Sequence, residues 1–110
     1  MQISVNCDDH ICCDAELIRR VEGVIAGTLA HFGEHLSRVE VWLRDLNSDD
    51  PGNRDKVCSL EARIAGAAPV NTEHEAPTLT EAIHVAAGKL ERLVGRQLRA
   101  VSDPGLAAGP

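Results

Sequence analysis

Four cations follow one another at spacings that would bring them to one side of a helix. Lys89, Arg92, Arg96 and Arg99 are three, four and three positions apart. At about 100° per residue, these spacings place all four within roughly 80° of a helical wheel. Contact with a phosphate backbone requires cations repeated along a rod in this way. The pattern therefore predicts a phosphate-binding flank, although cations near a helix C-terminus also suit the helix dipole and are often simply solvated.

A second group of residues has the types that bind metals. Cys7, His10, Cys12 and Cys13 stand close together, and zinc sites use four donors of this kind. Adjacent cysteines such as Cys12 and Cys13 seldom reach one metal together, and Cys58 stands alone downstream. We therefore expect no bound metal and no other cofactor, and we keep a small metal or redox sensor only as an alternative.

The sequence contains none of the usual signatures of an enzyme. It has no nucleophile elbow, no phosphate-binding glycine loop, no His-Glu-x-x-His and no dinucleotide fingerprint. The remaining histidines have no nucleophile paired with them in the sequence; they are His31, His35, His74 and His84. We therefore expect no catalytic activity and no small-molecule substrate.

The composition limits the partners and the compartment. The chain has 110 residues and a formal net charge of −6, so binding to nucleic acid would depend on a local basic patch. Its aromatic residues are Trp42 and Phe32 alone, which argues against recognition of bases by stacking. No apolar run is long enough to span a membrane, and the start does not resemble a signal peptide. We therefore expect a cytoplasmic protein without a membrane partner, in which all four cysteines are reduced thiols.

Hydrophobic periodicity predicts six elements that would position these groups. In chain order they are a strand over 2–6, a helix over 14–36, strands over 38–46, 57–65 and 70–75, and a helix over 78–101. The order predicts an α+β fold, β-α-β-β-β-α, with a four-stranded mixed sheet and both helices packed on one face. Residues 1–101 would form one domain, with a loop over 47–55 and a disordered tail over 102–110.

The same periods predict which residues are buried. The expected core comprises Val39, Val41, Leu43, Leu60, Ile64, Ile83, Leu90 and Val94. Asp14 is expected to cap the first helix, and Thr78 with Glu81 forms a capping box for the second. Trp42 falls on the uncovered face of the sheet, where it would form a protein interface or be covered by the tail or a loop.

Several stretches together resemble the bacterial family of ribosome hibernation promoting factor and ribosome-associated inhibitor A, in its short form. The opening Met1-Gln2-Ile3-Ser4-Val5 is similar to the family's first strand, and Asp14-Ala15-Glu16-Leu17 followed by Phe32 is similar to its first helix. The most specific stretch lies in the second helix, with Glu81-Ala82-Ile83, Lys89-Leu90-Glu91-Arg92 and Gln97-Leu98. The resemblance covers roughly residues 1–101.

This resemblance implies a non-enzymatic factor that binds the small ribosomal subunit near the decoding region and silences translation. Basic side chains would contact ribosomal RNA, and the candidates are Lys89, Arg92, Arg96, Arg99, Arg19 and Arg20. The chain would be a monomer or a weak homodimer. A diverged relative that uses Trp42 and the open sheet face as a protein-interaction module remains the alternative.

Overall fold

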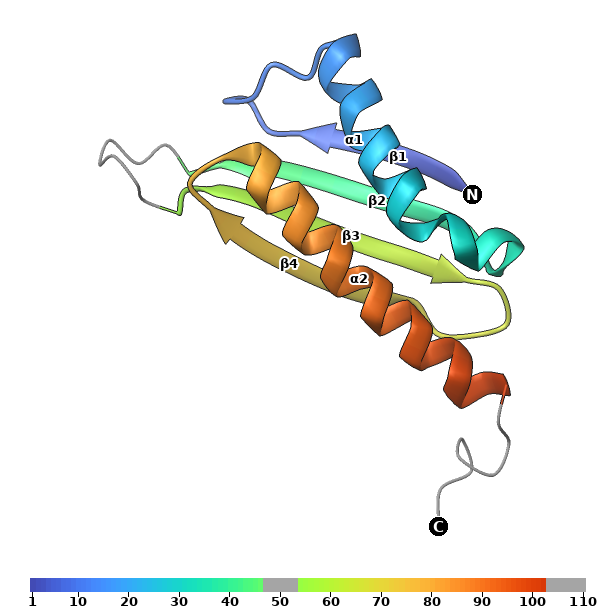
Figure 1. The fold of residues 1–110 in the computed structure, drawn as a ribbon. Coiled ribbons are helices and arrows are strands. Elements are labelled where there is room, and N and C mark those ends of the chain that lie inside the picture. The colour runs from blue at the N-terminus through green and yellow to red at the C-terminus, as the bar shows by residue number, and fades with distance from the viewer. Residues whose placement is uncertain (47–53, 103–110) are drawn as a thin grey trace.

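The computed structural model describes residues 1–46 and 54–102 (Figure 1). The elements in chain order are β1 (Gln2–Cys7), α1 (Ala15–Leu29), a 3-10 segment η1 (Ala30–His35), β2 (Leu36–Asp45), β3 (Lys56–Ile64), β4 (Val70–Ala76) and α2 (Leu79–Ser102). The predicted tail over 102–110 lies outside the described residues except for Ser102, which ends α2, and so does most of the predicted loop over 47–55.

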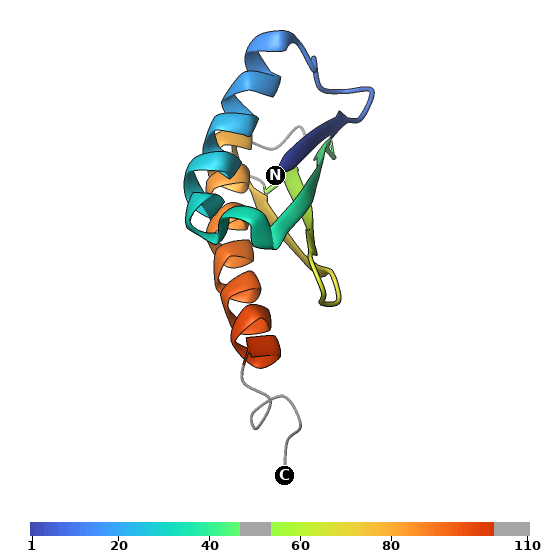
Figure 2. The same cartoon turned by 90° about the vertical axis from the view of Figure 1, so that its right-hand side faces the viewer.

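The four strands form one sheet in the order β1-β2-β3-β4. β1 runs parallel to β2, whereas β2, β3 and β4 pair antiparallel, so the sheet is mixed. Both helices lie on the same face of this sheet, and the other face is uncovered (Figure 2). The predicted α+β architecture is therefore confirmed, and β1 and β4 are its two edge strands.

Strand alternation separates a buried face from a solvated one. In β2, Val39, Val41 and Leu43 are buried beneath the helices, while Trp42 and Arg44 are exposed on the opposite face. Successive side chains of a strand point to opposite faces, so this sequence can bury only one of them. The buried residues of β3 lie directly opposite those of β2: Cys58 pairs with Leu43, and Leu60 pairs with Val41.

The core between the sheet and the helices is almost entirely aliphatic. Its α2 contribution is a stripe that includes three alanines, which let the helix lie close to the strands. Every residue of the predicted core is buried; the most fully enclosed large side chains are Ile25, Leu29, Leu36, Leu43, Leu60 and Leu90. Phe32 is only partly buried and packs at the margin of this layer.

Both helices begin where the sequence predicts. The Asp14 carboxylate accepts a hydrogen bond of 2.9 Å from the backbone N–H of Leu17. The Thr78 hydroxyl accepts one of 3.2 Å from the backbone N–H of Glu81. Each bond satisfies a backbone donor that the first turn of a helix leaves without a partner.

The predicted end of the first helix at Leu36 is wrong. The α-helix ends at Leu29, and the chain continues as η1 to His35. Gly33 has a φ of 53°, a left-handed conformation that breaks the helical path and that glycine adopts without steric cost. Leu36 does belong to the core, but as the first residue of β2, where it pairs with Ile64.

The expectation of four reduced thiols is also wrong. Cys7 and Cys13 form a disulfide that closes the loop between β1 and α1, with Cα atoms 5.9 Å apart. The loop turns back on itself, so that Cys13, just before the cap of α1, lies beside the last residue of β1. Sequence reasoning missed it because it inferred reduced thiols from an expected cytoplasmic location, and because residue type does not show which cysteines the fold brings together. Cys12 is a free, exposed thiol, and Cys58 is a free, buried one.

Asp8 fastens the same loop to the end of β2. One carboxylate oxygen accepts a hydrogen bond of 2.9 Å from the backbone N–H of Asp45, and the other accepts one of 3.0 Å from that of His10. The backbone N–H of Asp8 donates to the carbonyl of Leu43 at 3.0 Å. The bond from Asp45 is the main reason why the pKa of Asp8 is lowered. The loop is therefore held by both a covalent bond and hydrogen bonds.

Leu90→Ala is expected to lower the free energy of unfolding by about 2–5 kcal/mol, because Leu90 is fully buried at the centre of the α2 stripe. Urea unfolding followed by circular dichroism measures this difference. A loss below about half a kcal/mol, the range of ordinary surface substitutions, would contradict the packing of α2 on the sheet.

The cysteines should react in three steps with a thiol-specific disulfide reagent at pH 8. The native protein should yield one reactive thiol, Cys12, because burial raises the pKa of Cys58 to about 12 and shields it from the reagent. Unfolding in denaturant should expose the second free thiol, and prior reduction should release all four. Three reactive thiols in the native, unreduced protein would contradict the Cys7–Cys13 disulfide.

Candidate nucleic-acid interface

Three of the predicted cations gather at the C-terminal part of α2. Arg92, Arg96 and Arg99 are exposed there and border an open groove of about 460 Å³. The other side of the groove comes from η1, so it lies where the end of the first helical segment approaches α2 (Figure 1). The complete lining is His31, Phe32, Glu91, Arg92, Gly95, Arg96 and Arg99.

The η1 wall of this groove carries His31 and Phe32, which sequence reasoning did not place beside the arginines. His31 Nε2 lies 3.5 Å from a carboxylate oxygen of Glu91, and the rings of His31 and Phe32 have centroids 4.1 Å apart. Gly95 has no side chain and so leaves space in the groove between Phe32 and Arg99. A Cβ at this position would occupy that space, 3.4 Å from Arg99 Nη1 and 3.8 Å from Phe32 Cζ. The spacing of the cations contained no signal for this wall, because η1 lies about sixty positions earlier in the sequence.

These three arginines have no partner among the described residues. The structure gives none of them a hydrogen bond or an ion pair within residues 1–46 and 54–102. The arginines of the open sheet face differ in this respect, because each lies against a glutamate: Arg38 with Glu40, Arg44 with Glu73 and Arg63 with Glu61. An anion that approached α2 would therefore meet three arginines that form no ion pair with a described carboxylate; Glu91, which also lines the groove, lies against His31 instead.

Lys89 does not share this arrangement. Its ammonium group donates a hydrogen bond of 2.7 Å to the backbone carbonyl of Glu73 on β4. Lys89 is partly buried because it lies on the side of α2 that faces β4, at the margin of the predicted 80° sector. The predicted array of four cations is thus divided. Three arginines have no hydrogen-bond or ion-pair partner among the described residues, and one lysine is hydrogen-bonded to the edge strand β4.

Arg19 and Arg20 lie at the other end of the helical layer. α1 and α2 run in the same direction, so the start of α1 lies beside the start of α2 (Figure 1). Arg20 borders a cleft with Thr80 and His84, which are twelve or more positions before Arg96 on α2. Twelve residues of helix span roughly 18 Å. The two α1 arginines therefore lie far from the groove, and as adjacent residues they point about 100° apart around the helix.

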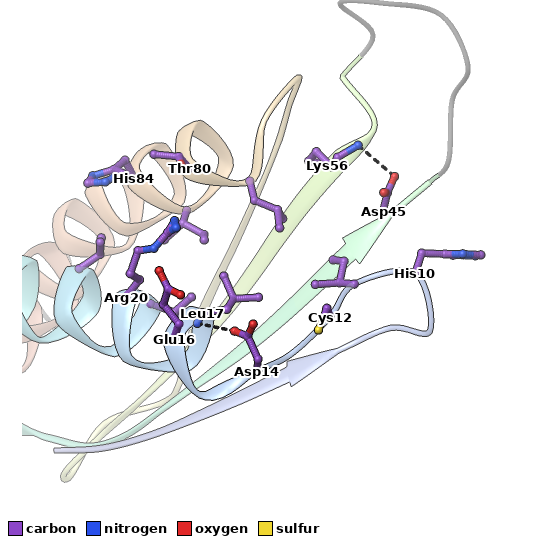
Figure 3. Close-up of a pocket in the computed structure, with 15 residues that line it drawn as sticks. His10, Cys12, Asp14, Glu16, Leu17, Arg20, Asp45, Lys56, Thr80 and His84 are labelled. Atoms are coloured by element: carbon purple, nitrogen blue, oxygen red, sulfur yellow. Dashed lines mark hydrogen bonds and ion pairs between the residues drawn. The ribbon is translucent and has the colours of Figure 1, made fainter.

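That second cleft, of about 450 Å³, lies between the first turns of the two helices (Figure 3). Its floor is apolar, with Leu17, Val21 and Ile83 among the residues that form it. Arg20 extends from α1 toward the first turns of α2, whereas Lys56 and Asp45 face each other at the opposite end (Figure 3). Sequence reasoning missed this cleft because its lining comes from separate parts of the chain.

Lys56 is held in place by two carboxylates at the mouth of this cleft. Its ammonium group lies 3.1 Å from Asp55 and 3.2 Å from Asp45. The hydrogen bond to Asp55 is the largest reason why the pKa of Lys56 is raised. Lys56 is therefore a positive charge already neutralised by its neighbours, unlike Arg92, Arg96 and Arg99.

Trp42 lies on the open face of the sheet, as predicted, and 40% of its surface is exposed. With Asn6, Arg44 and Ser59 it borders an open hollow of about 390 Å³. A large aromatic surface in this position is typical of protein interfaces. Its use as an interface stays a prediction.

Within the described part of the chain, no group of three or more His, Cys, Asp or Glu side chains is placed to hold a metal ion. The cluster considered for a metal sensor has instead given Cys7 and Cys13 to a disulfide. No described helix has both the length and the apolar character needed to cross a membrane.

Known proteins were compared with the chain by sequence and by structure. No protein-family model and no curated protein matches the sequence. Solved structures do match. The crystal structure of the Protein Y N-terminal domain from Thermus thermophilus aligns with a TM-score of 0.70 and 22% identity, over 87% of this chain and 98% of that domain. A ribosomal subunit interface protein from Coxiella burnetii aligns with a TM-score of 0.65 and 13% identity, over 87% of this chain and 96% of that one. At these identities the match shows a shared fold, the one that the resemblance to hibernation factors predicts.

Proposed function

We propose that this protein binds the small ribosomal subunit near the decoding region and silences translation, acting in the cytoplasm without catalysing a reaction. The observation that carries the proposal is the set of three arginines on α2 that have no partner among the described residues. The fold supports it, since one similar structure is described as a ribosomal subunit interface protein and another as a Protein Y domain.

The acidic composition makes the position of these arginines decisive. A chain with net charge −6 is repelled by RNA at long range, so only a face with local positive charge can approach phosphates closely. The α2 groove is such a face, and its arginines can bind phosphate oxygens without first breaking ion pairs. Each phosphate that they neutralise releases condensed counterions, which drives binding and makes it sensitive to salt.

The proposed mechanism is occupancy. A domain bound by one end of α2 to ribosomal RNA would fill space that messenger or transfer RNA needs, and the remaining faces would exclude these ligands by volume and by negative charge. No covalent step is required. Arg19 and Arg20 would touch RNA only if a second RNA segment passed the other end of the helical layer.

A second function is favoured by a separate observation on the sheet. Trp42 is exposed on a face whose arginines are paired with glutamates, so this face has little unbalanced positive charge. A protein surface of mixed polarity fits this face better than a nucleic acid does. The protein-interaction module is therefore the alternative if ribosome binding fails.

The double variant Arg92→Glu with Arg96→Glu should lose ribosome binding, because it replaces two free cations with anions at the groove. A ribosome pelleting assay at low and at moderate salt measures this, and binding of the wild type should fall steeply as salt rises. The matched control is Arg44→Glu with Arg63→Glu, which changes the net charge equally on the open sheet face and should bind nearly as the wild type does. Circular dichroism confirms that each variant is folded.

Three results of this assay would contradict the proposal. If the α2 variant pellets with ribosomes as the wild type does, the groove is merely solvated. If the wild type fails to pellet even at low salt, the chain has the fold without the function. Equal losses in both double variants would mean that overall charge, not the groove, decides binding.

Lys89→Gln should weaken ribosome binding less than Arg96→Gln does, although both remove one positive charge. Lys89 already donates to the carbonyl of Glu73, whereas Arg96 has no partner among the described residues. The slope of log affinity against log salt should become shallower for Arg96→Gln and stay near the wild-type value for Lys89→Gln. An equal change of slope in both variants would contradict the division of the four cations.

A further inference from the structure

The two edges of the sheet are protected very differently. On β4, the edge carries the charged residues Glu73 and Glu75, and the carbonyl of Glu73 is occupied by the ammonium group of Lys89 from α2. Charged side chains and covered backbone groups are the usual means by which proteins prevent another strand from joining an edge. β4 is therefore poorly suited to pair with a further strand.

β1, at the opposite edge, has none of these protections. The strand Gln2–Cys7 contains no charged residue, no proline and no glycine. Its register with β2 runs from Gln2 opposite Arg38 to Cys7 opposite Leu43 without a bulge. Nothing in the described part of the chain pairs with its outer side. In a parallel pair only alternate residues bond to the neighbouring strand, so about half of the backbone groups of β1 point outward.

The residues of β1 are arranged symmetrically about Ser4. Ile3 and Val5 flank it as two β-branched apolar residues, and Gln2 and Asn6 flank those as two amides. If two such strands pair antiparallel with Ser4 opposite Ser4, each Ile3 meets Val5 of the second copy and each Gln2 meets Asn6. Every cross-strand pair then joins residues of like chemistry on the same face of the sheet, which is the arrangement that stabilises antiparallel strands.

The apolar side chains of β1 are also partly exposed to solvent. Ile3 and Val5 pack against the core but are only partly buried, unlike Val39 and Val41 on the neighbouring strand. β1 is an edge strand, so on one side they have no neighbouring strand to pack against. A second β1 would place its own Val5 and Ile3 beside them and continue the apolar layer under the helices.

We propose that two copies of this chain associate through their β1 edges, antiparallel and across a two-fold axis at Ser4. Main-chain hydrogen bonds would join the two four-stranded sheets into one, as in other cases of strand addition. The occupant is a second copy because the sequence of β1 complements itself, and a two-fold contact of this kind uses the same patch on both molecules. α2 lies over β3 and β4, away from β1, so the arginine groove stays open in the pair (Figure 1).

Sedimentation equilibrium of the full chain tests the pairing from micromolar to millimolar concentration. The average mass of the wild type should rise with concentration from 11.8 kDa toward twice that value. Ser4→Lys and Ser4→Glu should each remain monomeric, because like charges would meet at the axis. An equimolar mixture of the two variants should recover the dimer mass, since opposite charges then face each other. Trp42→Ala should associate as the wild type does.

A second pair of variants covers the case in which a charge at position 4 disturbs the fold, since the Ser4 hydroxyl accepts a hydrogen bond of 3.0 Å from Arg38. In a Cys12→Ser background, Ser4→Cys should form an interchain disulfide under mild oxidation, because the two β-carbons meet at the axis. Gln2→Cys in the same background should not, because position 2 faces Asn6 of the second copy. Non-reducing gels of the whole chain detect the disulfide-linked dimer.

Each of the following results would overturn the proposal. The wild type stays at the monomer mass at every concentration, or Ser4→Lys dimerises as well as the wild type. The mixture of folded charge variants fails to associate, or Trp42→Ala abolishes the dimer. Gln2→Cys cross-links as readily as Ser4→Cys, which would place the axis elsewhere.

Discussion

The aliphatic layer between the sheet and the two helices is the contact on which the other features depend. It contains no fully buried aromatic residue among those described, so its order comes from the close fit of branched side chains and alanines. Ala86 and Ala87 bring α2 down onto the strands, and Leu90 and Val94 fix its rotation about its own axis. That rotation decides which flank of α2 meets water. The arginines are exposed at the groove, and Lys89 reaches β4, because the apolar stripe allows no other orientation.

Charge is organised differently on the two faces of the molecule. On the sheet, arginine and glutamate alternate along β2 and along β3, and Arg44 reaches Glu73 on β4. The exposed ion pairs that result contribute little to stability but offset the positive charge of each arginine. At the end of α2, positive charge is left uncancelled, apart from the Glu91 carboxylate that lies near His31. A protein with an acidic total charge thus has, among its described residues, a group of unpaired arginines at the C-terminal part of α2. Polarity of this kind orients a molecule toward a polyanion before any contact forms.

The sequence predicted those parts of the structure that local pattern determines. Alternation in Val39, Val41 and Leu43 identified the buried face of β2, and Asp14 and Thr78 marked the starts of both helices. It failed at one glycine inside the predicted helix and where residues distant in the sequence decide. The helical period continued past Leu29 although Gly33 turns the chain, and residue type alone could not reveal that Cys7 and Cys13 lie side by side. The spacing correctly placed Lys89 and the three arginines in one sector of the helical wheel. It could not show that Lys89 donates a hydrogen bond to the carbonyl of Glu73, because Glu73 lies on a neighbouring strand.

The protected β4 edge also limits the valence of the sheet, meaning the number of other sheets that it can join. A β-sheet with two free edges is divalent and can grow without limit, as fibrils do, whereas a sheet with one free edge can join only one other. The glutamates of β4, together with the lysine from α2 that occupies the Glu73 carbonyl, make this edge a poor partner for a further strand and so remove one of the two valences. What remains is self-limiting: any association through strands ends at a closed pair, and a short neutral strand such as β1 can stay uncovered without leading to aggregation.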